Sequence, residues 1–174
     1  SAPLKGILVV AKDSPVKDVH ELNGKVLAVP SANAIGASIL IRADLERLYG
    51  VRMTVRDVKT HASVYLHVAN GLADAGGGVQ KVFDEQDAAV RDRLRVLYTT
   101  RELPPHPVAA HPRVPPAVRE AVRKAFLDLR ATPEGAALLA PVPMRNAMAT
   151  SMDDYMPMAE WKLETYWVTE GARP

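Results

Sequence analysis

Residues 29–36, VPSANAIG, combine residue types that suit the binding of an anion. An apolar run ends on a proline, small polar residues follow, and a helix-like pattern begins. The first N–H groups of a helix lack acceptors within the helix and lie at the positive end of its dipole. The stretch therefore predicts either a helix that Ser31 or Asn33 merely caps, or an anion site. That site would be formed by Ser31, Ala32, Asn33 and Ala34.

A second candidate segment, residues 61–71, begins with His61 and also contains Ser63. Its pattern is helix-like, and it follows a strand-like run. Helices that follow neighbouring strands begin at the carboxyl edge of an open α/β sheet, where such sheets bind ligands. We therefore expect His61 to face the same anion as residues 31–36. His61 is also the one residue that we can name as a general acid or base, should this fold carry an enzyme.

Other chemistries have less support in the residue pattern. His61 and His67 are six residues apart, about 240° around a helix, so they do not share a metal-binding face. The chain has no cysteine, which excludes disulfides and thiolate ligands. It has no nucleophile-elbow serine and no glycine-rich nucleotide-phosphate signature. We expect no catalytic residue, no metal and no cofactor.

Composition sets broad limits on the partners. The 174 residues are 48% hydrophobic and 24% charged, which is typical of a globular protein. The 22 basic and 20 acidic residues are interspersed and leave a net charge of +2, which argues against nucleic acid as a partner. No stretch approaches the roughly 20 apolar residues of a membrane span. The opening residues, SAPLKG, do not have the pattern of a signal peptide.

Strand-like and helix-like patterns alternate over the first hundred residues. Helices are expected at 33–49 and 61–71, and strands at 6–12, 25–30, 53–59, 73–78 and 94–100. Strands that alternate with helices predict a mostly parallel sheet with right-handed crossovers. The glycines of residues 73–78 would leave room beside the backbone of that strand. This part of the chain therefore predicts one three-layer α/β unit.

The composition changes after residue 101. Residues 102–116 contain six of the 14 prolines, which is typical of a linker or a crossing segment. Residues 115–130 form an amphipathic helical pattern. Thr132 is placed to cap the next helix, with Pro133 at its first position. The aromatic residues of the final helical segment, Tyr155, Trp161, Tyr166 and Trp167, are expected to be packing residues or surface anchors.

Residues 60–78, THASVYLHVANGLADAGGG, resemble a segment of the phosphate/phosphite/phosphonate-binding proteins of ABC importers. In that family a Gly/Ser-His-Asp/Glu-Ser helix start precedes a V-x-x-G-x-A-D-A stretch. Residues 9–36 are similar to the family's V-x-K-D-S, D-L-x-G-K and serine-rich anion loop, and residues 94–129 to its return segment. The matching positions of the first segment are His61, Ser63, Val68, Gly71, Ala73, Asp74 and Ala75. The resemblance implies that Ser63 binds the ligand together with His61.

This resemblance, over about residues 6–130, implies a type II periplasmic binding fold, in which two α/β lobes joined by hinge strands close on an oxyanion. It assigns residues 12–100 to the second, ligand-binding lobe, which would be a complete three-layer unit. Residues 1–11 and 101–174 would form the hinge crossings and the helical C-terminal part of the first lobe. The N-terminal part of that lobe would be missing, so we expect a homodimer or an exchanged segment to cover its apolar surface.

The resemblance also implies a function. The chain would be the solute-binding component of an ABC importer, periplasmic or extracytoplasmic, that captures phosphate, phosphite or a phosphonate for a permease. An extracytoplasmic sensor domain and a small-carboxylate enzyme of the same fold are the alternatives. The family's Ser-Thr-Ser-Gly run is replaced here by residues 31–34, SANA, which removes two hydroxyl donors. Each lost hydrogen bond to a charged oxyanion costs about 1.5–3 kcal/mol, which lowers the affinity expected for a phosphonate.

Overall fold

The computed structural model describes residues 3–142 and 146–169. The chain divides into two compact units. The α/β unit contains Leu4–Leu103 and Met158–Pro174, and the helical unit contains Ser1–Pro3 and Pro104–Pro157. The lobe ranges expected from the sequence, 12–100 against 1–11 with 101–174, place these boundaries differently. Of those ranges, residues 1–2, 143–145 and 170–174 lie outside the described residues.

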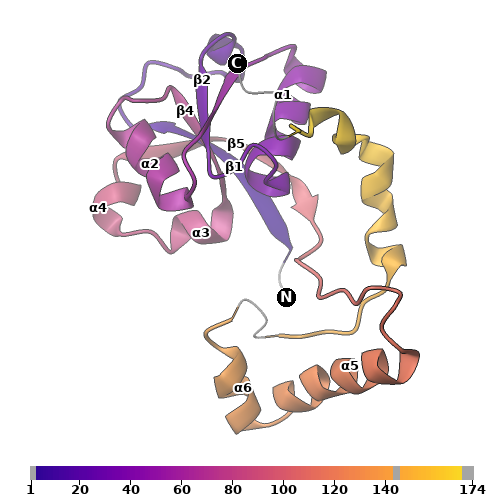
Figure 1. Ribbon diagram of the computed structural model, residues 1–174. Coiled ribbons are helices and arrows are strands. Elements are labelled where there is room, and N and C mark those ends of the chain that lie inside the picture. The colour runs from indigo at the N-terminus through magenta and orange to yellow at the C-terminus, as the bar shows by residue number, and fades with distance from the viewer. Residues whose placement is uncertain (1–2, 143–145, 170–174) are drawn as a thin grey trace. The chain divides into compact units, whose positions relative to one another are not determined.

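The α/β unit is built on a five-stranded sheet in the order β3-β2-β4-β1-β5 (Figure 1). Strand β2 is parallel to β3 and β4, whereas β1 is antiparallel to β4 and β5. Four strands therefore run in one direction, as the sequence predicts. The expectation did not include the reversed direction of β1, which lies between β4 and β5. The strands are β1 Leu4–Ala11, β2 Val26–Val29, β3 Thr54–Asp57, β4 Ala75–Val79 and β5 Leu94–Leu103.

Side chains alternate between the two faces of this sheet, because successive residues of a strand point to opposite sides. In β1, Leu8 and Val10 enter one core cluster, while Ile7 and Val9 enter the other, and all four are fully buried. A strand that is covered on both faces has a continuous apolar sequence, which is why residues 7–10 read ILVV. The α/β unit is therefore a three-layer structure, with one core on each side of the sheet.

The helices cover both faces of the sheet (Figure 1). The π-helix η2 (Ile35–Ile39) runs into α1 (Leu40–Tyr49) on one face, which confirms the helix expected at 33–49. The helix α2 (His61–Ala69) lies on the other face, as do α3 (Gln80–Asp84) and α4 (Ala88–Arg91). The last two were not predicted, because four or five residues are too few to show a helical period. A 3-10 helix, η1 (Val19–Leu22), precedes β2.

The helical unit contains α5 (Pro116–Arg130), α6 (Pro133–Leu139) and the 3-10 helix η3 (Met152–Asp154). The cap expected on α6 is confirmed, since Oγ1 of Thr132 accepts a 3.0 Å hydrogen bond from the N–H of Gly135. Helix α5 buries none of its residues, and Val118 and Val122 of its apolar stripe are nearly half exposed. The association expected from this stripe stays a prediction.

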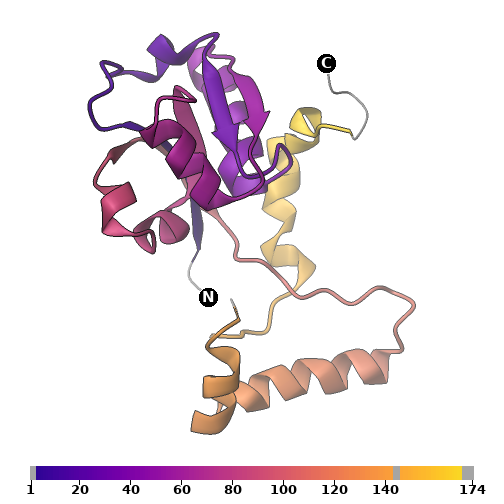
Figure 2. The same cartoon turned by 60° about the vertical axis from the view of Figure 1, so that its left-hand side comes forward.

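Residues 158–169 belong to the α/β unit, although the sequence assigned them to the first lobe with the rest of 101–174. They include the end of η4 (Met156–Trp161) and all of η5 (Leu163–Tyr166), and they run beside α1 in Figures 1 and 2. The ring of Tyr166 lies 5.1 Å from the guanidinium carbon of Arg47, a residue of α1. Trp161 and Tyr166 contact arginines of the α/β unit, whereas Trp167 is 57% exposed.

Candidate ligand-binding site

The two segments singled out from the sequence leave the sheet at the same edge. Strands β2 and β3 are parallel neighbours, and their last residues, Val29 and Asp57, are paired. Beyond the strands, the N–H of Val58 donates a 2.9 Å hydrogen bond to the carbonyl of Val29. Residues 30–34 follow β2 at this edge and residues 58–60 follow β3. The structure therefore places the start of η2 and the start of α2 after adjacent strand ends, as the sequence predicted.

Inside the loop of residues 31–34, several donors are already used. The N–H of Asn33 donates to Oγ of Ser31 at 3.2 Å, and the N–H of Ala34 donates to the carbonyl of Ser31 at 3.1 Å. Ala34 occupies the N-cap position of η2, and no side chain caps the helix. The alternative that Ser31 or Asn33 caps this helix is therefore wrong. The amides of Ile35 and Gly36 open the helix and have no acceptor within it.

The side chain of Asn33 contacts the C-terminal segment. Its Nδ2 donates to the carbonyl of Val168 at 2.8 Å, and its Oδ1 accepts from the N–H of Val168, also at 2.8 Å. One amide group therefore pairs with both backbone groups of a single residue. A direct contact between Asn33 and a ligand stays a prediction.

At the second segment, Thr60 caps α2. Its Oγ1 accepts a 3.0 Å hydrogen bond from the N–H of Ser63, and its hydroxyl donates to Oγ of Ser63 at 2.9 Å. His61 is the first residue of the helix and is partly buried. Its Nδ1 is buried and has no hydrogen-bond partner within the described part of the chain. Burial lowers the pKa of His61, which favours a neutral imidazole at neutral pH.

An aromatic group that the sequence analysis missed lies beside His61. The ring of Tyr65 is fully buried, with its centroid 6.4 Å from that of His61 and 5.4 Å from that of Phe83. A β-carbon on Gly78 would lie 2.4 Å from the hydroxyl of Tyr65, so glycine leaves room for this ring against β4. Tyr65 follows His61 by four residues, and this one-turn spacing is the signal that could have identified it.

Lys59 is a second residue that the sequence analysis missed. It lies between β3 and α2 with a φ of 77°, the left-handed region that a lysine rarely adopts. Its N–H donates to Oδ1 of Asp57 at 3.1 Å, and its exposed ammonium group lies 3.4 Å from the same atom. No sequence signal marks this conformation, because left-handed turns favour glycine and asparagine.

Close packing fixes the start of η2 on the sheet. A β-carbon on Gly6 would lie 2.2 Å from the carbonyl oxygen of Gly36, and one on Gly77 would lie 1.9 Å from that of Ala37. The helix can approach the backbones of β1 and β4 this closely because neither glycine has a side chain. The room beside residues 73–78 that the sequence predicted is therefore confirmed, and helix backbone occupies part of it.

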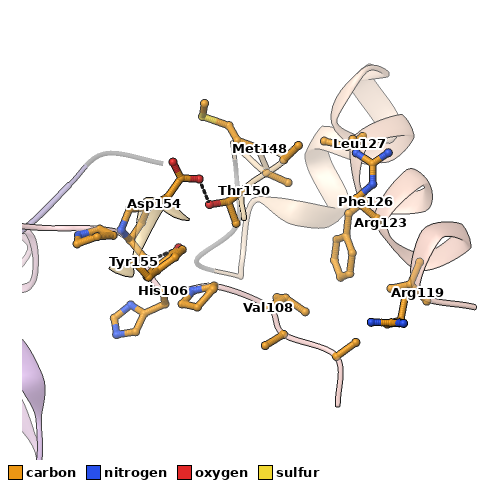
Figure 3. A pocket seen from close by; sticks show the side chains of 18 of the residues that line it. His106, Val108, Arg119, Arg123, Phe126, Leu127, Met148, Thr150, Asp154 and Tyr155 are labelled. Carbon is orange, nitrogen blue, oxygen red and sulfur yellow. Dashed lines mark hydrogen bonds between the residues drawn. The ribbon is translucent and has the colours of Figure 1, made fainter. Parts of the chain in front are cut away.

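The helical unit has a cavity of its own, which Figure 3 shows from close by. Its volume is about 640 Å³, and its walls are largely apolar, from the proline-rich segment, α5 and residues 147–155. The polar contacts beside it are internal: Thr150 donates to Asp154 at 2.6 Å, and Tyr155 donates to the carbonyl of Pro105 at 2.8 Å. None of the site residues predicted from the sequence lines this cavity.

The described residues provide neither a cluster of metal ligands nor a membrane-spanning helix. No group of three or more His, Cys, Asp or Glu side chains in that part of the chain could hold a metal ion. Within the same residues, no helix has both the length and the apolar character that crossing a membrane requires.

Solved structures show the same fold. XAC2383 from Xanthomonas citri, bound to chloride ion, is 16% identical with a TM-score of 0.75, over 94% of this chain and 66% of that chain. PA3383 from Pseudomonas aeruginosa, a binding protein component of an ABC phosphonate transporter, is 15% identical with a TM-score of 0.74, over 99% and 63%. An ancestral arginine-binding protein bound to arginine is 15% identical with a TM-score of 0.54, over 80% and 60%. This chain therefore spans about two thirds or less of their lengths.

The sequence match is more specific than the fold. Residues 1–155 match the protein family described as ABC transporter, phosphonate, periplasmic substrate-binding protein. The match covers most of the chain, including both segments at the carboxyl edge of the sheet. The mixed α/β architecture is that of part of a type II periplasmic binding fold. The chain belongs to the family of periplasmic substrate-binding proteins of phosphonate ABC transporters.

Proposed function

We propose that this chain is the ligand-capturing part of an ABC-importer solute-binding protein and that it takes a small oxyanion such as phosphate, phosphite or a phosphonate. One observation carries the proposal. The pairing of Val29 with Asp57 brings the loop of residues 31–34 and the start of α2 to one edge of the sheet, in a chain of a substrate-binding family. Ligands of open α/β sheets bind outside the carboxyl ends of the strands.

The donors at this edge suit an oxyanion. The first amides of η2, on Ile35 and Gly36, supply N–H groups at the positive end of a helix. The hydroxyls of Ser31 and Ser63 and the imidazole of His61 supply side-chain donors. Their arrangement on two separate segments favours a compact anion that both can reach at once.

Arg42 adds positive charge behind the loop. Its Nη2 donates to the carbonyl of Ala32 at 2.7 Å, and its Nε donates to Oγ of Ser38 at 3.2 Å. No carboxylate forms an ion pair with Arg42 within the described residues. The guanidinium charge is therefore not neutralised by a neighbouring side chain, which raises the local potential for an anion.

The wider role that we propose follows from the family. Its members are periplasmic proteins that bind substrate for ABC transporters, so a permease is the partner that we propose for this chain and the periplasm its compartment. We propose binding rather than catalysis, because no described group pairs His61 with a nucleophile. Residues 31–34 offer one hydroxyl where the family offers three, so a phosphonate should bind more weakly to this chain than to a family member with the full run.

An NMR titration tests the proposal. Phosphate, phosphite, methylphosphonate and sulfate would be added separately to the ¹⁵N-labelled chain. We expect at least one anion to shift the amide signals of residues 31–36 and 61–63 together. His61→Ala should weaken that binding by roughly tenfold or more, the loss of one charged hydrogen bond. His67→Ala is the matched control, because Nδ1 of His67 lies 2.7 Å from the carbonyl of Ser63 within the same helix.

Two results would contradict the proposal. The first is that none of the four anions shifts these signals. The second is that an anion shifts signals only elsewhere, for example in the helical unit. Equal binding by the wild type and His61→Ala would show that His61 does not contact the anion, but it would not contradict binding by the loop of residues 31–34.

A further inference from the structure

We infer that residues 161–168, the C-terminal strap, hold the loop of residues 31–34 in its ligand-binding conformation, with Asn33 and Arg42 as the positioning residues. The strap and the loop contact each other although more than a hundred residues separate them in the sequence. The part of this inference that concerns a ligand rests on the proposed function, whereas the part that concerns the loop conformation does not.

The first link is between Asn33 and Val168. The side-chain amide of Asn33 donates to one backbone group of Val168 and accepts from the other, both at 2.8 Å. This is the exchange of two hydrogen bonds that paired residues make in an antiparallel ladder. Separating the strap from the loop would leave the donor and acceptor of a partly buried amide unpaired, which is costly. The two hydrogen bonds therefore stabilise the contact between the loop and the strap.

The second link is the guanidinium of Arg42. Its Nη2 donates to the carbonyl of Ala32 in the loop at 2.7 Å and to the carbonyl of Tyr166 in the strap at 2.8 Å. The carbonyl of Ala32 and the N–H of Asn33 belong to one trans peptide, so they point in opposite directions. Because Arg42 binds the carbonyl of Ala32, the N–H of Asn33 points away from Arg42. This N–H donates to Oγ of Ser31.

The remaining contacts fix the strap itself. The backbone carbonyls of Trp161 and Lys162 both accept hydrogen bonds from Arg47 of α1, the second at 2.9 Å. The rings of Trp161 and Tyr166 stack against arginines, with Arg101 4.9 Å from the first and Arg47 5.1 Å from the second. Because both ends are attached to the α/β unit, the strap is a fixed support for the loop.

The test substitutes Val168 in the strap and measures amide hydrogen exchange in the loop. Val168→Pro removes the N–H that Asn33 accepts and keeps the carbonyl, whereas Val168→Ala keeps both backbone groups. Amide hydrogen exchange is followed over residues 30–37, where every residue except Pro30 has an N–H, far from the substitution in sequence. We expect Val168→Pro to speed exchange there about tenfold relative to Val168→Ala, the effect of one lost hydrogen bond. Equal exchange at residues 30–37 in the two variants would overturn the inference, even if residues 161–168 exchange faster.

A second pair of variants uses a different contact. Tyr166→Ala removes the ring that stacks on Arg42 and Arg47, while Tyr166→Phe keeps a ring in that place. We expect the alanine variant alone to speed exchange at residues 30–37. This pair decides the question if Val168→Pro fails to fold, and equal exchange in the two tyrosine variants would then overturn the inference.

Anion binding is measured separately on the same variants. With phosphate or methylphosphonate as the probe, Val168→Pro should bind about tenfold more weakly than Val168→Ala. If the wild type binds neither phosphate, phosphite, methylphosphonate nor sulfate, the proposed function fails and the exchange data alone decide on the strap. If the wild type binds an anion and both Val168 variants bind it equally, the strap does not position the loop for its ligand.

Discussion

The hydroxyl of Tyr98 donates a 2.9 Å hydrogen bond to Oδ2 of Asp44, a carboxylate that is almost completely buried in the α/β unit. Oδ1 of Asp44 accepts from Arg101 at 3.1 Å. The guanidinium of Arg101 in turn lies over the ring of Trp161. Burial raises the pKa of Tyr98, and the hydrogen bond to Asp44 raises it further, so the phenol stays protonated and keeps donating. Asp44 therefore joins α1 to β5, and Arg101 joins this pair to the C-terminal strap.

Replacing Asp44 should reduce the stability of this unit. We expect Asp44→Ala to lower the free energy of unfolding by about 2–4 kcal/mol, because it removes two hydrogen bonds to a buried charge. Glu102→Ala is the control, since Glu102 pairs with Lys5 at 3.2 Å on the surface of the same sheet. The control should change stability by less than about 0.5 kcal/mol. Urea denaturation followed by circular dichroism measures both, and equal effects would show that burial of Asp44 adds nothing.

Packing at the start of η2 gives a second prediction. We expect Gly77→Ala to destabilise the chain by about 2–3 kcal/mol, because its β-carbon would collide with the carbonyl of Ala37. Gly76→Ala is the comparison, since the three atoms nearest to its β-carbon would be side-chain atoms, of Val64, Val68 and Val9. Side chains can shift more easily than helix backbone, so Gly76→Ala should cost less. Thermal unfolding gives the order, and the reverse order would contradict this account.

The apolar stripe of α5 gives a third prediction. Val118 and Val122 are nearly half exposed, so the association expected from the sequence would cover them. We expect light scattering to show a mass that rises with concentration, and Val122→Lys to lower it toward the monomer. Arg119→Lys, which changes an adjacent residue outside the stripe and keeps its charge, should leave the mass unchanged. A monomer at every concentration would contradict the prediction.

Much of the α/β unit could be predicted because its signals are local. The run at residues 7–10 and the helical period from residue 33 depend on neighbouring residues, and both elements form where expected. The reversed direction of β1 could not be predicted, because its pairing with β4 joins residues about seventy positions apart. Strand direction is set by topology, and a fully buried strand looks the same in either direction.

The candidate site was predictable only in part, for a similar reason. The edge location follows from strand order, which the alternation of elements indicates. The partner of Asn33 cannot be predicted from strand order, because Val168 lies 135 residues away and contributes only backbone atoms. A backbone group has no side chain that a sequence pattern could show. The sequence therefore suggested a ligand for the side chain of Asn33, which is hydrogen-bonded to the backbone of Val168.

Lys59 provides a prediction about strain. Its φ of 77° is costly for a residue with a β-carbon and ordinary for glycine. We expect Lys59→Gly to raise the free energy of unfolding by up to about 1 kcal/mol, while oxyanion binding weakens through the loss of the ammonium group. Lys81→Gly, at the second residue of α3, should destabilise the chain instead. Chemical denaturation and an anion titration provide the two readouts, and a loss of stability in Lys59→Gly would show that the turn is not strained.

His61 makes the stability of the chain depend on pH. Burial lowers its pKa in the folded state, and its Nδ1 has no hydrogen-bond partner within the described residues. Above the ordinary histidine range both states are neutral, so His61 contributes no pH dependence there. As the pH falls below the pKa of the unfolded chain, only the unfolded state takes up the proton. Stability is therefore lost on acidification until the pH reaches the lowered pKa of the folded state.

The glutamine variant isolates this effect. As the pH falls from about 8 to about 5, we expect the free energy of unfolding of the wild type to decrease relative to that of His61→Gln. The change is at most about 1.4 kcal/mol per pH unit for one group, and the other histidines are common to both proteins and cancel. A bound oxyanion acts in the opposite sense, because it favours the imidazolium and raises the pKa. Anion binding by the wild type should therefore tighten relative to binding by His61→Gln as the pH falls, a comparison at each pH in which the ligand's own titration cancels. Parallel pH profiles for stability and for binding in the two proteins would show that His61 titrates freely and does not face the anion.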